Sequence, residues 1–315
     1  MEFSGTRSVE VCTVMAVTDG DASNRTRRGK RWLFGAHMSI AGGMDQAVLR
    51  ARLVGCDALQ VFTKNNNQWR AAPFRDGEVE AFRRLIAETG IGPVVAHDGY
   101  LINLAARRRP LWKKSLAAFI VELQRCATLA IPFLVTHPGA HGGAGEAEGI
   151  RRVAEALAAA LAAVPGPMVL LEATAGQGTS LGWRFEQLAA MRAAVPAPMR
   201  RRIGVCLDTC HLFAAGYDFR TPAAYRALRG TLDATLGLGL VRAIHMNDSK
   251  KGLGSRVDRH EHIGRGHIGP SGFRQFVRDP AWRGIPMLLE TPKEPDFRRT
   301  DRRNLAALRR LAGVA

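Results

Sequence analysis

The sequence contains no apolar run of the roughly 18 residues that a membrane-spanning helix needs. Its five cysteines are an odd number without a paired framework, which suits a reducing compartment. We expect Cys206 and Cys210 to be packing residues. The first residues contain no apolar core of a secretory signal, and acidic side chains among them argue against a transit peptide. These absences favour a cytoplasmic protein with no membrane partner.

Acidic side chains are also few. There are 28 of them against 45 lysines and arginines, which gives a formal net charge of +17. The basic residues occur in clusters such as RTRRGKR at 25–31 and RRR at 107–109. A positive field of this size attracts polyanions, nucleic acid first. An arginine-rich genome that solubilises its protein surfaces with arginine is the alternative explanation, and charge alone does not decide between the two.

The chain divides into a short leader and one domain. Residues 1–31 are mixed and polar and end in the basic run, so we expect a disordered leader there. Residues 32–315 are predicted to form a single catalytic domain, because α/β barrels routinely occupy 200 to 250 residues as one unit.

From Leu33 onward one pattern repeats: a short apolar run ends in a polar residue and is followed by a helical stretch. Runs such as PVVAH and MVLLE are typical of parallel strands buried on both faces, and EVEAFRRLIAETG has helical spacing. Eight such units predict an α/β fold, the (β/α)8 TIM barrel. An open doubly wound sheet is the alternative, but no segment has the glycine spacing of a dinucleotide or phosphate loop.

Polar side chains end the predicted strands, at the face where barrel enzymes place their active sites. Besides His37, six of the eight strand ends carry a histidine or a carboxylate: His97, His137, Glu172, Asp208, His245 and Glu290. Imidazoles and carboxylates packed together need cations to neutralise them. The sequence therefore predicts a metal centre at the mouth of the barrel.

Further candidates lie in two other motifs. CLDTCH places His211 three residues after Asp208, and GSRVDRHEHIGRG places Asp258, His260 and His262 at alternate positions, which share one face of an extended chain. With His211, Asp258 and His260 the candidates number nine, five histidines and four carboxylates. This set without a thiolate suits zinc, manganese or iron, and with one shared carboxylate it is large enough for three ions.

Several longer motifs carry a family resemblance. The segments FTKNNNQWRAAP, HDGYLINLA, THPGAH, LLEATAGQGTSLG, DTCHLFAAGYD and GSRVDRH resemble, in this order, the motif series of the endonuclease IV family. These enzymes are the apurinic/apyrimidinic-site endonucleases of base-excision repair. The match runs from about Phe34 to Pro292, nearly the whole chain apart from the leader, and motifs of this length are highly specific.

The resemblance implies a barrel that holds three zinc ions, with Mn²⁺ at one or more sites as an open alternative. It assigns the ligands in three sets: His97, His137 and Glu172; Glu172, Asp208, His245 and Glu290; and His211, Asp258 and His260. The family shows no histidine at the position of His262, so we predict that His262 is not a ligand. His37 is expected to contact the ligands or a phosphate.

The reaction that the resemblance implies is hydrolysis of the phosphodiester 5′ to an abasic site in duplex DNA, leaving a 3′-hydroxyl, by a monomer. The catalytic residues are then Glu172, the bridging carboxylate, and Glu290, a ligand that can also orient the attacking water. Removal of 3′-blocking groups is a further activity that stays open.

Recognition of damaged DNA is expected from loops. An abasic nucleotide is easier to flip out than a normal one, and by resemblance Tyr100 and Leu101 wedge into the duplex beside it. The residues expected to contact DNA are Tyr100, Leu101, Asn65, Asn67, Gln68 and Arg259. The family has an arginine at the position of Asn67 and an acidic residue at that of Arg265, so these two positions depart from its pattern.

Two other classes of function remain open at this stage. A sugar isomerase or epimerase of the same barrel type would use one metal set from the later strands, without need of Asp258 and His260. A non-catalytic nucleic-acid-binding barrel would explain the charge but not nine converging ligands. The number of bound metal ions separates the first from an endonuclease, and nicking of an abasic duplex separates the second.

Overall fold

The computed structural model describes residues 31–314. The leader that we predict for residues 1–31 therefore lies, apart from its last residue, outside the described residues. Residues 31–314 belong to one compact unit. Within this described part of the chain, no helix combines the length and the apolar character that crossing a bilayer requires.

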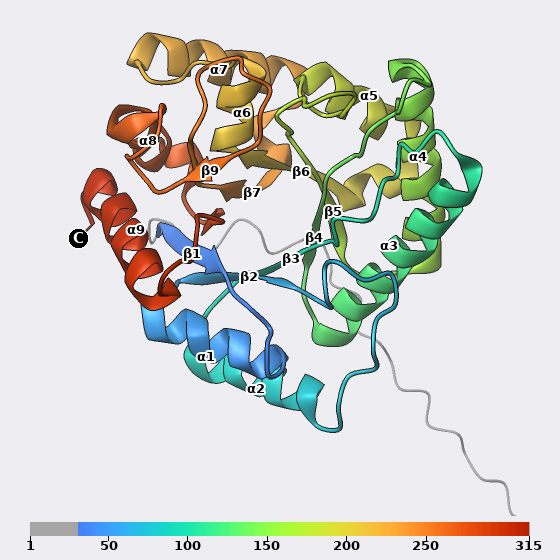
Figure 1. The fold of residues 1–315 in the computed structure, drawn as a ribbon, viewed down its shortest axis with the longest axis horizontal. Coiled ribbons are helices and arrows are strands. Elements are labelled where there is room, and N and C mark those ends of the chain that lie inside the picture. Colours follow the sequence, from blue (N-terminus) through green and yellow to red (C-terminus); the bar gives the residue numbers. More distant parts are fainter. Residues whose placement is uncertain (1–30, 315) are drawn as a thin grey trace, which may run out of the picture. The chain divides into compact units, whose positions relative to one another are not determined.

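Eight parallel strands close into a barrel, which confirms the predicted (β/α)8 fold (Figure 1). They are β1 (Leu33–His37), β2 (Ala58–Phe62), β3 (Val94–His97), β4 (Phe133–Thr136), β5 (Met168–Glu172), β6 (Ile203–Asp208), β7 (Val241–His245) and β10 (Pro286–Leu289). The barrel closes where β10 pairs with β1. Each strand coincides with one predicted apolar run to within a residue at its carboxyl end, because strands buried on both faces carry a nearly continuous apolar pattern.

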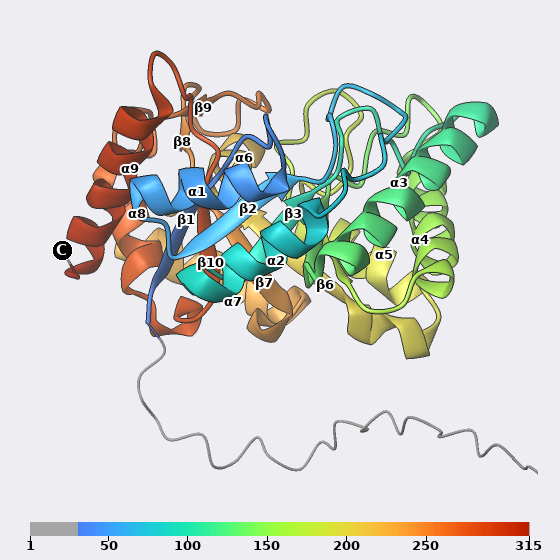
Figure 2. The ribbon, with the colours of Figure 1, turned by 90° about the horizontal axis from the view of Figure 1, so that it is seen from below.

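Eight helices surround the strands (Figures 1 and 2). They are α1 (Met44–Val54), α2 (Glu78–Thr89), α3 (Arg109–Leu129), α4 (Glu146–Ala163), α5 (Phe185–Ala194), α7 (Pro222–Thr235), α8 (Gly269–Arg278) and α9 (Phe297–Ala312). Short 3₁₀ turns η1 (Ala197–Arg202), η2 (Leu238–Leu240) and η3 (Pro280–Trp282) precede β6, β7 and β10.

Three small elements lie at the end of the barrel where the strands finish. The helix α6 (Thr209–Ala215) follows β6 directly, and β8 (Asp248–Ser249) pairs antiparallel with β9 (His260–Glu261). In Figure 2, β8 and β9 lie above the barrel. The helix α6 contacts β8, so the segment after β7 is held close to the end of β6.

The inside of the barrel is built in layers. A buried apolar cluster takes one inward-facing residue from each strand: Leu33, Ala58, Val95, Val135, Leu170, Cys206, Ala243 and Leu288. Side chains at i and i+2 point to the same face of a strand. Two residues further along β3, β5 and β7 come His97, Glu172 and His245, which therefore also face the barrel axis. We call this apolar layer the floor of the barrel, and the polar strand ends lie next to it along the barrel axis.

Candidate metal centre

Glu172, at the end of β5, lies at the centre of the predicted site and is completely buried. Its Oε2 is 3.1 Å from Nε2 of His97 and 3.2 Å from Nε2 of His137. Its Oε1 is 3.0 Å from Nδ1 of His245. One carboxylate therefore faces histidines from three other strands, in an arrangement that suits a bridging ligand.

A second group lies on the other side of Glu172. Nδ1 of His245 is 3.3 Å from Oε2 of Glu290 and 3.7 Å from Oδ2 of Asp208. Asp208 and His245 are direct neighbours in the register of β6 and β7. The candidate ligand atoms of Glu172, Asp208, His245 and Glu290 all lie within 4.8 Å of one another, which is close enough for one ion to contact all four.

The third group joins α6 to the segment before β9. Nε2 of His211 is 3.1 Å from Oδ2 of Asp258, and Nε2 of His260 is 3.2 Å from Oδ1 of the same carboxylate. Asp208 caps α6, because its Oδ1 accepts a hydrogen bond from the His211 backbone N–H at 2.9 Å. The spacing in DTCH thus turns His211 toward Asp258 while leaving the second Asp208 oxygen facing His245.

The imidazoles are held in the orientation that metal ligands need. Nδ1 of His97 donates to the Asp98 carbonyl at 2.9 Å, and Nδ1 of His211 donates to that of Ala173 at 3.0 Å. Nδ1 of His260 donates to the Glu290 carbonyl at 3.2 Å. A proton on Nδ1 leaves the lone pair of a neutral ring on Nε2, which in each case faces the carboxylates.

The surroundings of two of these nitrogens show whether the site fits cations. Among residues 31–314, the buried Nε2 atoms of His211 and His260 have no hydrogen-bond partner, although oxygens of Asp258 lie 3.1 and 3.2 Å away. In each case a nitrogen lone pair and a carboxylate oxygen face each other without a hydrogen bond between them. Divalent cations bind such pairs of donors. The residues therefore fit metal ions.

The charges of the site point the same way. Burial opposes ionisation of Glu172, but His245 and His137 hold the pKa of this carboxyl well below its usual range. Burial disfavours the charged form of His97, yet Glu172 raises the pKa of the ring to about 9. Positive charge next to the buried carboxylates therefore stabilises this site, and divalent cations can supply it.

Two buried thiols lie next to the cluster. Cys206 belongs to the apolar floor of the barrel and Cys210 to α6. Burial raises the pKa of each thiol to about 12, so both stay protonated and act as weak hydrogen-bond donors. Their positions agree with the expectation that they are packing residues.

His262 does not join the alternating set. The chain pairs with β8 only through His260 and Glu261 and then turns away. Nδ1 of His262 lies 3.1 Å from the amide nitrogen of Asn304 on α9. The extended backbone ends before His262. Asp258 and His260 therefore lie on one face of the chain, whereas His262 does not share it.

The residues predicted to contact DNA lie around the mouth. Tyr100 and Leu101 follow β3 and are 66% and 36% exposed, large fractions for side chains that would otherwise bury apolar surface. The other predicted contacts are exposed too, beside the centre: Asn65, Asn67, Gln68 and Arg259.

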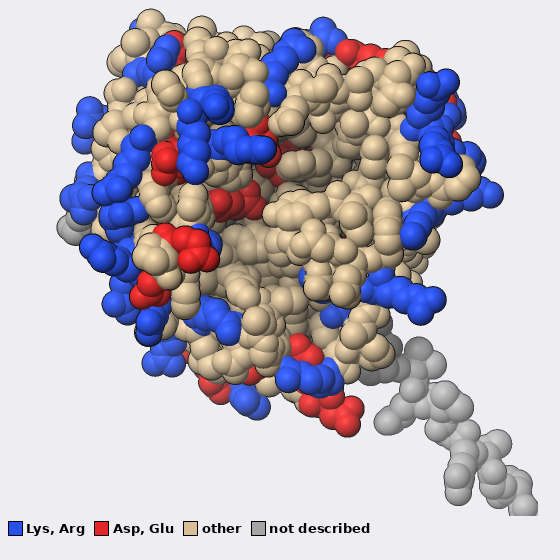
Figure 3. All heavy atoms as spheres, viewed as in Figure 1, with Lys and Arg blue, Asp and Glu red and all other residues tan. Residues whose placement is uncertain are grey.

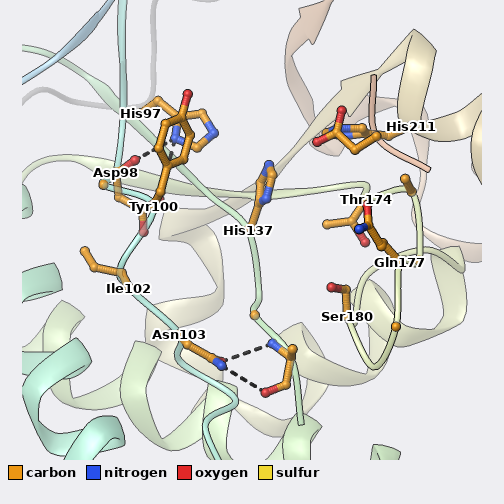
Figure 4. A pocket seen from close by; sticks show the side chains of 17 residues that line it. His97, Asp98, Tyr100, Ile102, Asn103, His137, Thr174, Gln177, Ser180 and His211 are labelled. Atoms are coloured by element: carbon orange, nitrogen blue, oxygen red, sulfur yellow. Dashed lines mark hydrogen bonds and ion pairs between the residues drawn. The ribbon is translucent and has the colours of Figure 1, made fainter. Parts of the chain in front are cut away.

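The centre opens to solvent on both sides of Tyr100. One cavity of about 500 Å³ is lined by His97, His137 and His211, and Figure 4 shows these rings around it. A second cavity of about 520 Å³ is lined by His37 and Glu290, and Tyr100 borders both. Figure 3 shows acidic side chains inside the central hollow, and lysines and arginines mainly along the outline of this face of the molecule. Basic side chains on this face attract polyanions, and a phosphate that entered the hollow would meet carboxylates unless cations cover them.

We did not identify two buried polar networks from the sequence. Gln60 lies inside β2 and contacts both His245 and Glu290. Lys64, in the loop after β2, forms a buried ion pair with Glu122 of α3 at 3.3 Å. The only signal for Gln60 is a polar residue within the apolar run ALQVF.

Comparison with known proteins agrees with this geometry. A family model described as xylose isomerase-like TIM barrel matches residues 48–311. A protein of Chloroflexus aurantiacus described as probable endonuclease 4 is 54% identical over 280 residues, 88% of this chain and 97% of that protein. The chain belongs to the endonuclease IV family. The resemblance seen in the motifs is thereby confirmed.

Solved structures distinguish the family from the fold. The crystal structure of endonuclease IV from Thermus thermophilus is 38% identical, covers 90% of this chain and 100% of its own, and has a TM-score of 0.79. A D-psicose 3-epimerase has a TM-score of 0.65 at 15% identity, over 89% of this chain and 99% of its own. The likeness to the sugar epimerase concerns the fold alone, whereas the endonuclease IV likeness extends to sequence along the barrel.

Proposed function

We propose that this protein is a metal-dependent endonuclease that hydrolyses the phosphodiester 5′ to abasic sites in duplex DNA and leaves a 3′-hydroxyl. The observation that carries the proposal is that nine imidazole and carboxylate side chains, Glu172 among them, come together in three neighbouring groups of possible metal ligands. Membership of the endonuclease IV family supplies the substrate class.

The three groups would hold three Zn²⁺ ions, with Mn²⁺ as an alternative at one or more of them. Such ions supply Lewis-acid chemistry, lowering the pKa of water toward neutrality and neutralising phosphate. The three groups contain only nitrogen and oxygen donors, and the neighbouring thiols stay protonated. Zinc and manganese both bind nitrogen and oxygen donors. Paired ions are a recurring device of phosphoryl chemistry.

The protein's own residues bind and orient the substrate. Glu172 belongs to two of the groups and would be shared by their ions, and Glu290, at the edge of the second cavity, would orient an attacking water. Burial lowers the pKa of His37, whose ring Glu290 contacts at 3.6 Å, so a neutral His37 can donate a hydrogen bond to phosphate. Tyr100 and Leu101 would fill the gap left by the displaced nucleotide, which is least costly to displace where a base is missing.

The loop after β2 would reach the minor groove of the DNA. Asn65, Asn67 and Gln68 are exposed there, and the family's arginine is replaced by Asn67, which reaches less far and carries no charge. Arg259 is exposed beside the third group and would contact phosphate. We further propose that the protein acts as a monomer in the cytoplasm, which light scattering and cell fractionation can test.

The test is incubation with a duplex that carries one tetrahydrofuran abasic analogue. We expect one nick 5′ to the analogue, with a 3′ end that DNA polymerase extends directly, and we expect the Glu172→Gln variant and chelated protein to lose it. Circular dichroism of the variant controls for folding. Equal cleavage of undamaged duplex, or nicking that persists in folded Glu172→Gln, would overturn the proposal. Duplexes with blocked 3′ ends test the additional activity in the same assay.

A further inference from the structure

Gln60 is a completely buried polar residue within an apolar strand. It follows Ala58 of the barrel floor by two residues, so it occupies the same ring of inward-facing positions as His97, Glu172 and His245. In the register of the sheet it stands beside His37. Unlike these neighbours, its side chain cannot carry a charge.

Both ends of the Gln60 amide contact residues of the predicted second group. Its Nε2 lies 2.5 Å from Oε1 of Glu290 and 3.0 Å from Nδ1 of His37, and its Oε1 lies 2.8 Å from Nε2 of His245. An ionised carboxylate only accepts hydrogen bonds, so the amide nitrogen must face Glu290. The amide oxygen then faces His245, whose Nε2 must carry the proton.

This hydrogen bond decides which nitrogen of His245 is free. With a proton on Nε2, the lone pair of the neutral ring is on Nδ1, which lies 3.0 Å from Oε1 of Glu172 and 3.3 Å from Oε2 of Glu290. The bond from Gln60 to the other Glu290 oxygen leaves Oε2 facing the same space. One amide therefore orients two donors of one group.

His245 differs in this respect from three other histidines of the centre. The rings of His97, His211 and His260 are held through main-chain carbonyls, which no substitution of a single side chain removes. His245 is held by a side-chain amide. The orientation of this ligand is thus open to mutation without changing any ligand.

We propose that Gln60 is a positioning residue of the metal centre, which sets the tautomer of His245 and directs Glu290 toward the ion that they share. The inference rests on the proposed function, since it assumes that these residues hold an ion. Hydrogen-bonding partners of metal ligands commonly change metal affinity by about 10- to 100-fold. We expect a loss of that size at one ion, with the other two retained.

The test compares Gln60→Met with Gln187→Met. Methionine has a similar volume and makes no amide hydrogen bonds. Gln187, on α5, is also a buried glutamine with hydrogen bonds at both ends, to the Gly182 backbone N–H at 2.7 Å and to Glu146 at 2.8 Å. Its side chain forms no hydrogen bond with any of the nine candidate ligands, so it controls for the loss of a buried amide.

Metal content is measured by elemental analysis after timed dialysis against a chelator, and affinity by competition with a chromophoric chelator. We expect Gln60→Met to release one equivalent of zinc about 10- to 100-fold more readily than the wild type, and Gln187→Met to behave like the wild type. In the Co²⁺-loaded proteins, only Gln60→Met should shift the visible d–d bands, which report ligand geometry.

The outcomes separate the two proposals. A wild type that retains metal together with a Gln60→Met variant that matches Gln187→Met in release and in spectrum would overturn the role of Gln60 alone. A folded wild type that binds no metal at micromolar concentration would overturn the proposed function and the role of Gln60 with it.

Discussion

Nε2 of His211 lies 3.1 Å from Oδ2 of Asp258, although 47 residues separate the two in the chain. His211 is fixed by the cap of α6 and by the Ala173 carbonyl, whereas Asp258 belongs to a more exposed segment. The segment is anchored by hydrogen bonds from the Gly254 and Arg256 backbone N–H groups to carbonyls of α6. The third group is therefore assembled only when this segment folds over α6.

Removal of either side chain from this segment should disable the site. We expect Asp258→Ala and His260→Ala each to reduce nicking of the abasic duplex by at least about a hundredfold, more than loss of an outer-sphere partner costs. His262→Ala is the matched control: it removes the contact with Asn304 but no candidate ligand, and it should leave the nicking rate nearly unchanged. Comparable losses in all three variants would show that the ligand set is wrong.

The ion content follows from the three His and carboxylate groups. We expect three ions per chain, one for each group, in protein purified without chelator and measured by elemental analysis. Prolonged chelation should abolish nicking, and Zn²⁺ should restore it, because the donors are held by hydrogen bonds independent of the ions. One ion per folded chain would instead favour the single metal set of a sugar isomerase.

Leu101 should act on damaged DNA in particular. If its exposed side chain fills the space of the displaced nucleotide, Leu101→Ala loses roughly 1.5 to 3 kcal/mol of burial on the abasic duplex, about ten- to a hundredfold in affinity. Undamaged duplex offers no such gap and should bind almost unchanged. Fluorescence anisotropy at one fixed salt concentration measures the ratio of the two affinities. An unchanged ratio would return Leu101 to ordinary loop packing.

Binding should weaken steeply as salt is added. Each lysine or arginine contact to a phosphate releases counterions and contributes a slope of about −0.9 in log K against log salt. Arg259→Ala should make the slope less negative by about one such contact. Asn67→Arg should make it more negative, since it adds a cation where the family carries one. A binding constant that is flat from low to physiological salt would argue against DNA as the substrate.

The buried pair of Lys64 and Glu122 should stabilise the loop after β2. Lys64 also donates to the Gln68 carbonyl at 2.7 Å, and Glu122 accepts from Thr63. Glu122→Gln leaves a buried cation without its partner and should lower the free energy of unfolding by about 3 to 5 kcal/mol. The control is Glu88→Gln, in an exposed pair with Arg84, which should cost about 0.5 kcal/mol or less. Equal denaturant midpoints for both variants would contradict this.

The barrel could be predicted because its signals are local. Apolar runs of four to six residues ending in a polar residue recur eight times, and each became a barrel strand. The same alternation that buries Val95 and Leu170 in the floor carries His97 and Glu172 to the mouth two residues later. The pattern that predicts the strands therefore also predicts where the side chains of the site lie.

Local pattern was insufficient where the backbone changes direction. Asp258, His260 and His262 alternate in the same way, yet the pairing with β8 ends at Glu261 and Asn304 of α9 holds the His262 ring. Only the motif resemblance pointed to this difference from the sequence. The physical reason is that the end of a two-residue strand depends on its neighbours, which lie far away in the chain.

By itself the sequence determined the fold and the identity of the side chains that face the mouth, because both follow from the periodicity of short segments. Tertiary structure alone decided which atoms meet. The amide of Gln60 reaches His245 and Glu290 only because β2, β7 and β10 belong to one closed barrel, and this contact selects the nitrogen of His245 that faces the carboxylates. The tautomer of a histidine depends on which hydrogen-bond partner lies about 3 Å from each ring nitrogen. These partners come from different strands of the barrel, and a local sequence pattern does not encode such contacts.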